Sequence, residues 1–249
     1  MSCKIPEFQS VTVFILTNDE TTLLRKTVEE IKKSDGFSDI SKIVLVAKNN
    51  SCNGYVEAER LIDEDTSGKV NLYLQKSDTV ELCIAELPLL VTDSHFIIMA
   101  GDMEMNPGEI SAFIKMAKES PEAVICAAKW MKGSVVEGYG IIHEIGSRTM
   151  NTFISLLFGK RVKDPFSIYQ IYPLSVYKAL NFSNPYVFAY EYTVKALHNG
   201  IEYKEIPTTY KKRSEGKSHV DAKKMVRTAI AFCLTSLKIR FSERVINKK

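Results

Sequence analysis

The sequence predicts an α/β protein with a mixed, mostly parallel sheet and helices on both of its faces. Short apolar, β-branched segments alternate with segments whose apolar residues recur at helical spacing. The apolar segments are nearly continuous, which is typical of strands buried on both sides of a sheet. Strands that are separated by helices need crossover connections, and these place helices on both faces.

Five strands are predicted in the first half of the chain. The first, VTVFILT, ends at Asn18 and Asp19, which are turn residues. The other strands are the apolar segments at 43–47, 70–75, 95–100 and 123–128. Each is short and bounded by polar or turn-forming residues, as expected of strands.

Four helices are predicted between these strands. The first has Leu23, Leu24, Val28 and Ile31 at helical spacing, with Asp19 or Thr21 as its N-cap. The second contains apolar residues between 56 and 62, and the third spans 79–91 with a kink at Pro88. The fourth begins near Pro107, because proline is well placed in a first helical turn.

The second half is less regular. We expect helices at 150–158, 174–180 and 186–198, an extended segment at 167–172, and short strands in EYKEIP and TTY. The polar segment RSEGKSH predicts a mobile loop. Residues 222–241 predict an amphipathic helix, and its apolar stripe consists of Val226, Ile230, Cys233, Leu237 and Phe241.

The composition is that of a globular protein. Its 249 residues, 45% hydrophobic and 25% charged, suit one large α/β domain or two small ones. The net charge of +3 is small and the basic residues are not interleaved with aromatic ones, so we expect no nucleic-acid partner. The sequence shows no signal peptide and no apolar window long enough to cross a membrane. Five dispersed cysteines without a C-x-x-C pair indicate reduced thiols and a cytoplasmic protein.

The stretch FIIMAGDMEMNP, residues 96–107, is the strongest chemical signal. Asp102 and Glu104 follow a buried strand at its carboxyl end, where parallel α/β sheets bind ligands. Two acids with one residue between them can point to the same side if the chain stays extended, and oxygen ligands suit Mg²⁺ or Mn²⁺. Such an ion would neutralise a diphosphate leaving group. The alternative is a solvated acidic turn that caps the helix after Pro107.

Several motifs recur in a family order. They are VFILTNDE, then KNNSCNG, GDMEMNP, DPFSIYQ, FAYEYTVKAL and finally GIEYKEIPTTYKKRSEGKSH, which is the most specific of them. In this order they resemble the family 2 glycosyltransferases with a Rossmann-like GT-A fold. The branch that they resemble most closely is that of dolichyl-phosphate mannose synthases and bacterial polyprenyl-phosphate sugar transferases. The resemblance spans about residues 10 to 240.

The resemblance implies one domain over residues 1–249. Residues 10–105 would form the nucleotide-binding half, 106–220 the acceptor half and 221–245 a C-terminal amphipathic helix. It implies metal-dependent, inverting transfer of a sugar from a nucleotide-sugar donor to a glycan or lipid-phosphate acceptor, with Mn²⁺ or Mg²⁺ as cofactor. A role in polysaccharide biosynthesis follows from the same resemblance.

The resemblance also implies site residues. Asp102 and Glu104 would hold the metal, and the acids Asp164 and Glu191 would be catalytic on the acceptor side. The nucleotide-binding residues would be Thr17, Asn18, Asp19, Asn49, Ser51, Gly101 and Asp102. The phosphate- or acceptor-binding residues would be Tyr210, Arg213, Lys217 and Ser218, and Gly216 would let their loop bend as a lid.

The chain departs from the family pattern at several of these positions. Lys48, Asn49 and Asn53 replace acids of the base-binding motif, and Glu104 stands where aspartate is usual. Gln170 replaces an arginine and His219 a lysine. The nucleotide base is therefore left open. A catalytically degenerate GT-A-like binding or assembly module is the alternative function. A nucleotidyltransferase is a third, which the late Arg-x-x-Gly-x-Ser segment disfavours.

Three further features have competing interpretations. The C-terminal helix carries lysines and arginines beside its apolar stripe, so it either packs on the domain or docks peripherally on the inner face of an anionic membrane. His143 and Glu144 have no second histidine at i+4 and are interpreted as a surface pair. Trp130 and Tyr139 are interpreted as packing residues near the site.

Overall fold

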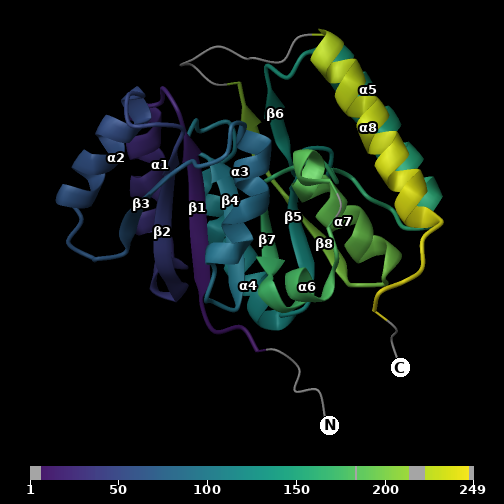
Figure 1. The fold of residues 1–249 in the computed structure, drawn as a ribbon, viewed down its shortest axis with the longest axis horizontal. Helices are drawn as coiled ribbons and strands as arrows, with labels where there is room; N and C mark the ends of the chain where they lie inside the picture. Colours follow the sequence, from purple (N-terminus) through teal and green to yellow (C-terminus); the bar gives the residue numbers. More distant parts are fainter. Residues whose placement is uncertain (1–6, 183, 213–221, 247–249) are drawn as a thin grey trace.

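The computed structural model describes residues 7–182, 184–212 and 222–246, and only the backbone of 222–226. Its main sheet has seven strands in the order β3-β2-β1-β4-β7-β5-β8 (Figure 1). They are β1 Val11–Thr17, β2 Ile40–Ala47, β3 Val70–Leu74, β4 His95–Ala100, β5 Val124–Ala128, β7 Gln170–Pro173 and β8 Tyr203–Pro207. β7 runs antiparallel to β4 and β5, and the other pairs are parallel. The predicted mixed, mostly parallel sheet is confirmed.

The strand order reverses at β1. After β1 the chain adds β2 and β3 on one side, and then crosses to place β4 on the other side of β1. The registers Thr17↔Ala47 and Leu16↔Ala100 bring the carboxyl ends of these three strands to one edge of the sheet. Such a switch point is where open α/β sheets bind ligands.

The two faces of the sheet are covered by different helices. One face packs against α1 Thr22–Lys33, α2 Asn53–Asp63 and α4 Ile110–Glu119, and the other against α3 Val80–Glu86, α6 Leu174–Ala179 and α7 Phe188–His198. Successive side chains of β1 pack on opposite faces of the sheet, because side chains alternate in direction along a strand. Val13 and Ile15 pack toward α1, whereas Phe14 packs toward α3 and α7.

Three of the predicted helices adjoin a short 3₁₀ turn that has a proline in its first turn. The helix predicted at 79–91 is α3 followed by a 3₁₀ turn, η2 Leu87–Leu90, with Pro88 in its first turn. The helix expected near Pro107 begins as η3 Pro107–Glu109 before α4. η4 Pro185–Val187 leads into α7 in the same way. Proline suits a first helical turn because its missing N–H would have no intrahelical partner there.

A third layer of helices lies outside α7. It consists of α5 Ile141–Phe158 and α8 Ala222–Arg240, which pack on α7 through Ile154, Leu197 and Ile239 (Figure 1). α5 is longer than the segment predicted at 150–158. α8 does pack on the domain, but its predicted stripe residues Ile230, Leu237 and Phe241 are exposed. In the described part of the chain, no helix combines the length and the apolar character needed to cross a bilayer.

A second, small sheet was not predicted as such. β6 Val135–Glu137 pairs in parallel with β9 Thr209–Lys211, and β9 also bridges to the loop after β4 at Met105↔Tyr210. This pairing carries the chain segment after β8 across the carboxyl edge of the main sheet. It thereby closes one side of the candidate site.

Candidate functional site

The loops after β1 and β2 are joined at the switch point. The Gly54 amide donates to the Asn18 carbonyl at 2.7 Å, and the Lys48 amide donates to the Thr17 carbonyl at 3.3 Å. A side chain at position 54 would place its Cβ 2.8 Å from the Asn18 carbonyl oxygen, so this close approach requires glycine. The structure thus brings together two of the segments predicted to bind a nucleotide.

Side chains of these loops stabilise the loops themselves. Asn49 Oδ1 accepts hydrogen bonds from the Ser51 amide at 3.0 Å and the Ser51 hydroxyl at 2.8 Å, which is an Asx turn. Glu20 accepts the Asn18 amide at 2.7 Å. Asp19 is exposed and accepts the Asn18 side-chain amide at 3.0 Å. Glu20 was not singled out from the sequence, although it directly follows the predicted Asn18-Asp19 turn.

The loop after β4 holds both predicted metal ligands on one tight turn. The Gly101 amide donates to the Leu16 carbonyl at 2.9 Å, which ties this loop to β1. Asp102 is buried, and its Oδ1 accepts the Glu104 amide at 3.1 Å. Met103 between them has a φ of 57°, in the left-handed region that side chains other than glycine rarely adopt. Such strain is concentrated at functional sites.

Strand β9 brings Tyr210 to this turn. The Lys211 amide donates to the Glu104 carbonyl at 2.8 Å, beside the Met105↔Tyr210 bridge. The ring of Tyr210 packs edge-on against Tyr139, with 5.2 Å between centroids. Burial raises the pKa of Tyr139, and the negative charges of Asp164 and Glu104 raise it further. The aromatic pair therefore lies between the metal turn and the acceptor half.

Asp164, predicted as catalytic, forms a buried ion pair. Its Oδ2 lies 2.6 Å from Lys129 Nζ and accepts a hydrogen bond from the Lys129 backbone amide at 3.1 Å. Burial lowers the pKa of Lys129, but the charge of Asp164 and its hydrogen bond, with smaller contributions from Tyr139 and Cys126, together raise it above its ordinary value, so the ammonium stays charged. Asp164 Oδ1 is buried without a hydrogen-bond partner among the described residues. Glu205 accepts the amides of Lys163 and Asp164, and burial raises the pKa of Glu205.

A cavity of about 550 Å³ opens beside Lys129. The residues that line it include Lys129, Trp130, Lys132, Tyr139, Glu144 and Arg148. A second cavity of about 320 Å³ shares Trp130 and Arg148 with the first and adds Arg161 and Lys163. Cations outnumber acids in both linings, so the pair of cavities suits an anionic ligand.

Arg148 is held in place between the two cavities. Its guanidinium lies 4.6 Å from the Trp130 ring centroid, and its Nε donates to Glu144 at 2.8 Å. Trp130 Nε1 in turn donates to the Ser147 hydroxyl at 2.8 Å, and its ring packs on Tyr139. The two aromatic residues do pack near the site, as predicted. Glu144 pairs with Arg148, and His143 is exposed.

Glu191 is placed differently from the other predicted site residues. It lies in the first turn of α7, fully buried, with Oε1 2.8 Å from Lys195 Nζ. Its Oε2 accepts the Asn184 amide at 2.8 Å. It does not belong to the described lining of either cavity. Its catalytic role stays a prediction.

Other predictions lie outside the described residues. Arg213, Lys217 and Ser218 belong to the segment 213–221, as do Gly216 and His219.

Lys129 and Arg148 were not found by sequence reasoning. For Lys129 a signal existed, because it directly follows the apolar segment of β5 as Gly101 follows β4. For Arg148 the one signal was Glu144 four residues before it, which indicates a helical ion pair and not a ligand site.

The turn offers two carboxylates to a metal ion. Among the described residues, no three His, Cys, Asp or Glu side chains lie together as a complete metal cage. Two oxygen ligands still fit Mg²⁺ or Mn²⁺, because such ions commonly keep water and substrate phosphate oxygens in their remaining positions. Asp102 and Glu104, one residue apart on a strained turn, are a compatible pair.

No protein-family model matches the sequence. The structure is similar to solved structures of glucosyl-3-phosphoglycerate synthase from Mycobacterium tuberculosis. One complex, with Mn²⁺, UDP and phosphoglyceric acid, has a TM-score of 0.68 at 9% identity over 94% of this chain and 80% of that chain. The chain has the GT-A fold.

Two further complexes of that enzyme superpose nearly as well on this chain. The complex with Mn²⁺, UDP-glucose and phosphoglyceric acid has a TM-score of 0.66 at 8% identity, over 93% of this chain and 80% of that chain. The complex with Mg²⁺ and UDP has a TM-score of 0.65 at 8% identity, over 93% and 79%. At such identities the likeness concerns the fold alone.

Proposed function

We propose that the protein is a metal-dependent glycosyltransferase that moves a sugar from a nucleotide-sugar donor to an acceptor with inversion. One observation carries this proposal. The Asp102–Glu104 turn lies at the switch point of a GT-A sheet, with the joined loops after β1 and β2 on one side. On its other side, Tyr210 and Tyr139 lead to a cationic cavity.

The donor would bind in the half formed by residues 10–105. Asp102 and Glu104 would hold Mn²⁺ or Mg²⁺, and the ion would neutralise the leaving diphosphate. Residues 17–19 and 49–51 would cradle the nucleoside, because their backbone and side-chain amides lie at the same edge as the two carboxylates. Gly101 lets the metal turn approach β1 and α1 closely, since a Cβ there would lie 3.2 Å from Ile15 Cγ2 of β1 and 2.9 Å from Leu24 Cδ1 of α1.

The acceptor would bind in the half formed by residues 106–220, in the cavity beside Lys129. Its excess of cations favours an acceptor that carries negative charge, such as a lipid phosphate or an anionic glycan. A phosphate oxygen is already anionic and needs no strong base. This suits Asp164, whose carboxylate is engaged by Lys129. Tyr210, Arg213, Lys217 and Ser218 would contact phosphates, as the family resemblance implies.

A non-catalytic binding module is the second candidate. Lys48, Asn49 and Asn53 replace acids of the family's second motif, one of which typically contacts the nucleotide base in the family that the chain resembles. Asn49 uses its Oδ1 within its own loop rather than presenting it to a ligand. A protein that kept the fold and lost donor binding would show this pattern.

A stability screen separates the two candidates. The purified protein would be unfolded thermally with UDP-, GDP-, CMP- and dTDP-sugars, each with Mn²⁺, Mg²⁺ or EDTA. A ligand at about 100 times its Kd adds about 2.7 kcal/mol of stability. We expect one nucleotide to stabilise the protein only with metal, and to lose this effect in Asp102→Asn but not in Glu137→Gln, an exposed acid on nearby β6. No shift with any nucleotide would favour the non-catalytic module.

A further inference from the structure

The helices α5 and α8 form a parallel pair at the surface. Cys233 Sγ lies 3.8 Å from Met150 Sδ, and Arg240 Nε donates to the Leu157 carbonyl at 2.9 Å. Both contacts join residues 83 positions apart in the chain, so the two helices run in the same direction in constant register. Figure 1 shows the pair as the outermost layer on one side of the molecule.

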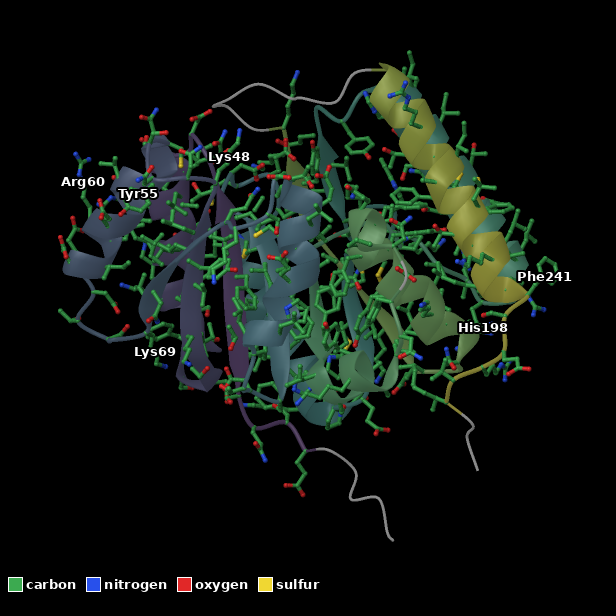
Figure 2. The ribbon with its side chains drawn as sticks, viewed as in Figure 1. Lys48, Tyr55, Arg60, Lys69, His198 and Phe241 are labelled. Atoms are coloured by element: carbon green, nitrogen blue, oxygen red, sulfur yellow. The ribbon has the colours of Figure 1, made fainter. Side chains whose placement is uncertain are left out.

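The outward side of this pair is apolar. On α5 the exposed positions 142, 145, 149, 152 and 156 recur every three or four residues. The apolar residues among them are Ile142, Ile145 and Leu156. The same spacing joins Ile230, Leu234 and Leu237 of α8 to Phe241, which directly follows the helix and is 82% exposed. Figure 2 shows Phe241 pointing away from the body at the end of α8. We call the seven apolar residues among them the outer apolar face: Ile142, Ile145, Leu156, Ile230, Leu234, Leu237 and Phe241.

The domain core does not use this face. α5 buries Asn151 and Ile154 on its opposite side, and α8 buries Ser236 and Ile239. Tyr190 of α7 packs on Phe232 with its ring tilted and contacts Ser236, which fixes the inward side of α8. An exposed patch of this length on two aligned helices marks an interaction surface.

The rim of the outer apolar face is strongly basic. Within the described residues 141–161 and 227–246 there are seven cationic residues against two acids. The cations are Arg148, Lys160, Arg161, Arg227, Lys238, Arg240 and Arg244, and all are exposed. One of the two acids, Glu144, pairs with Arg148. Apolar residues flanked by lysine and arginine are the pattern of helices that lie in the headgroup region of anionic membranes.

We propose that the outer apolar face docks on the surface of an anionic lipid bilayer, with α5 and α8 lying in the plane of the headgroups. A second copy of the chain fits less well, because a two-fold contact would bring the same cationic rims together. The proposal requires no spanning segment. It is independent of the proposed sugar transfer, because only these two helices and their flanking charges carry it.

The docked orientation has a consequence for the site. Thr152 and Leu156 line the smaller cavity, and Leu156 also belongs to the outer apolar face. Arg148 lines both cavities. The cavities therefore open next to the lipid surface, where an anionic headgroup or lipid-linked phosphate would be within reach of Arg148 and Arg161.

Vesicle flotation of the full chain tests the proposal. The probes are phosphatidylcholine vesicles with and without phosphatidylglycerol, at low and high salt. We expect binding to the anionic vesicles, weakened by salt because screening reduces surface attraction. The double variant Leu234→Glu/Phe241→Glu should bind at least about tenfold less. Leu89→Glu, an equally apolar and exposed residue on η2, is the matched control and should bind like the wild type.

Two results would overturn the proposal. The first is absence of binding to anionic vesicles, or equal binding by the wild type and the double variant. The second is a dimer in light scattering that the double variant dissociates, because a second copy would then cover the face. Circular dichroism and thermal unfolding would show that both variants are folded. Vesicle binding is measured without sugar transfer, so failure of the proposed enzyme activity would not affect this test.

Discussion

Lys129 and Asp164 meet in a buried ion pair, with 2.6 Å between Nζ and Oδ2. Lys129 directly follows β5, and Asp164 lies in the segment between α5 and β7. The pair therefore ties the carboxyl edge of the sheet to the chain that returns from the outer helix layer. The Lys129 ammonium also faces the rings of Tyr139 and Tyr210, at 5.7 and 6.0 Å from their centroids. One buried cation thus organises the floor of the proposed acceptor cavity.

Asp164→Asn should strongly destabilise the protein. The substitution leaves the Lys129 ammonium buried without its counter-charge, and removal of one partner of a buried pair typically costs about 3–5 kcal/mol. Urea unfolding would measure the loss. The double variant Lys129→Met/Asp164→Asn should recover much of it, because no buried charge is left. A stable Asp164→Asn protein that lacks only activity would instead assign Asp164 a catalytic role.

Gly54→Ala should weaken both stability and nucleotide binding. The added Cβ would push against the Asn18 carbonyl and the Thr17 side chain, so the loops after β1 and β2 must separate. Overpacking of this kind costs about 1–3 kcal/mol. Gly146→Ala on α5 is the control, because nothing lies within 4 Å of its Cβ. It should stabilise the protein by about 0.5–1 kcal/mol. Thermal unfolding with and without nucleotide would read out both effects.

The buried strands and the metal turn could be predicted from the sequence. A strand that is covered on both faces must be apolar whichever strands it pairs with. Segments such as 95–100 can therefore be predicted as strands from the sequence alone. The reversed direction of β7 was not visible, because strand direction depends on the path of the connecting chain. β6 has only three residues and exists through its pairing with β9. Its two valines favour a strand, but a segment this short does not predict one by itself.

The outer helices show a different limit of sequence reasoning. Periodicity locates an apolar stripe, but it does not tell which side of the helix meets the domain. The stripe residues Ile230 of α8 and Phe241 directly after it are exposed, whereas the polar Ser236 is buried against Tyr190. The first half of α5 was not predicted. Its apolar residues Ile142 and Ile145 are exposed, and this half has no buried residues whose spacing would indicate a helix. Tertiary contacts decided both cases.

His95 should make stability depend on pH between about 4 and 6.5. Burial lowers the pKa of its ring to about 4, although the hydrogen bond from Nε2 to the Pro121 carbonyl opposes this shift. The unfolded ring binds a proton near pH 6.5, so the neutral folded ring is fully stabilising above that pH. This stability is lost as pH falls toward 4, by about 3 kcal/mol in total. Urea unfolding of His95→Asn should show a smaller slope in this range, and exposed His143→Asn should keep the wild-type slope.

Glu104→Gln should lower metal-dependent activity while the fold is kept. The contacts that Glu104 makes to Asp102 and Lys211 use its backbone amide and carbonyl, and glutamine retains both. The substitution removes the carboxylate charge, and with it one anionic oxygen ligand for Mn²⁺ or Mg²⁺. Turnover with the nucleotide-sugar selected by the stability screen should fall by at least about tenfold, with the loss partly recovered at higher Mn²⁺. Glu137→Gln removes a charge from β6, outside the turn, and should be as active as the wild type. Wild-type turnover in Glu104→Gln would show that Glu104 does not bind the metal.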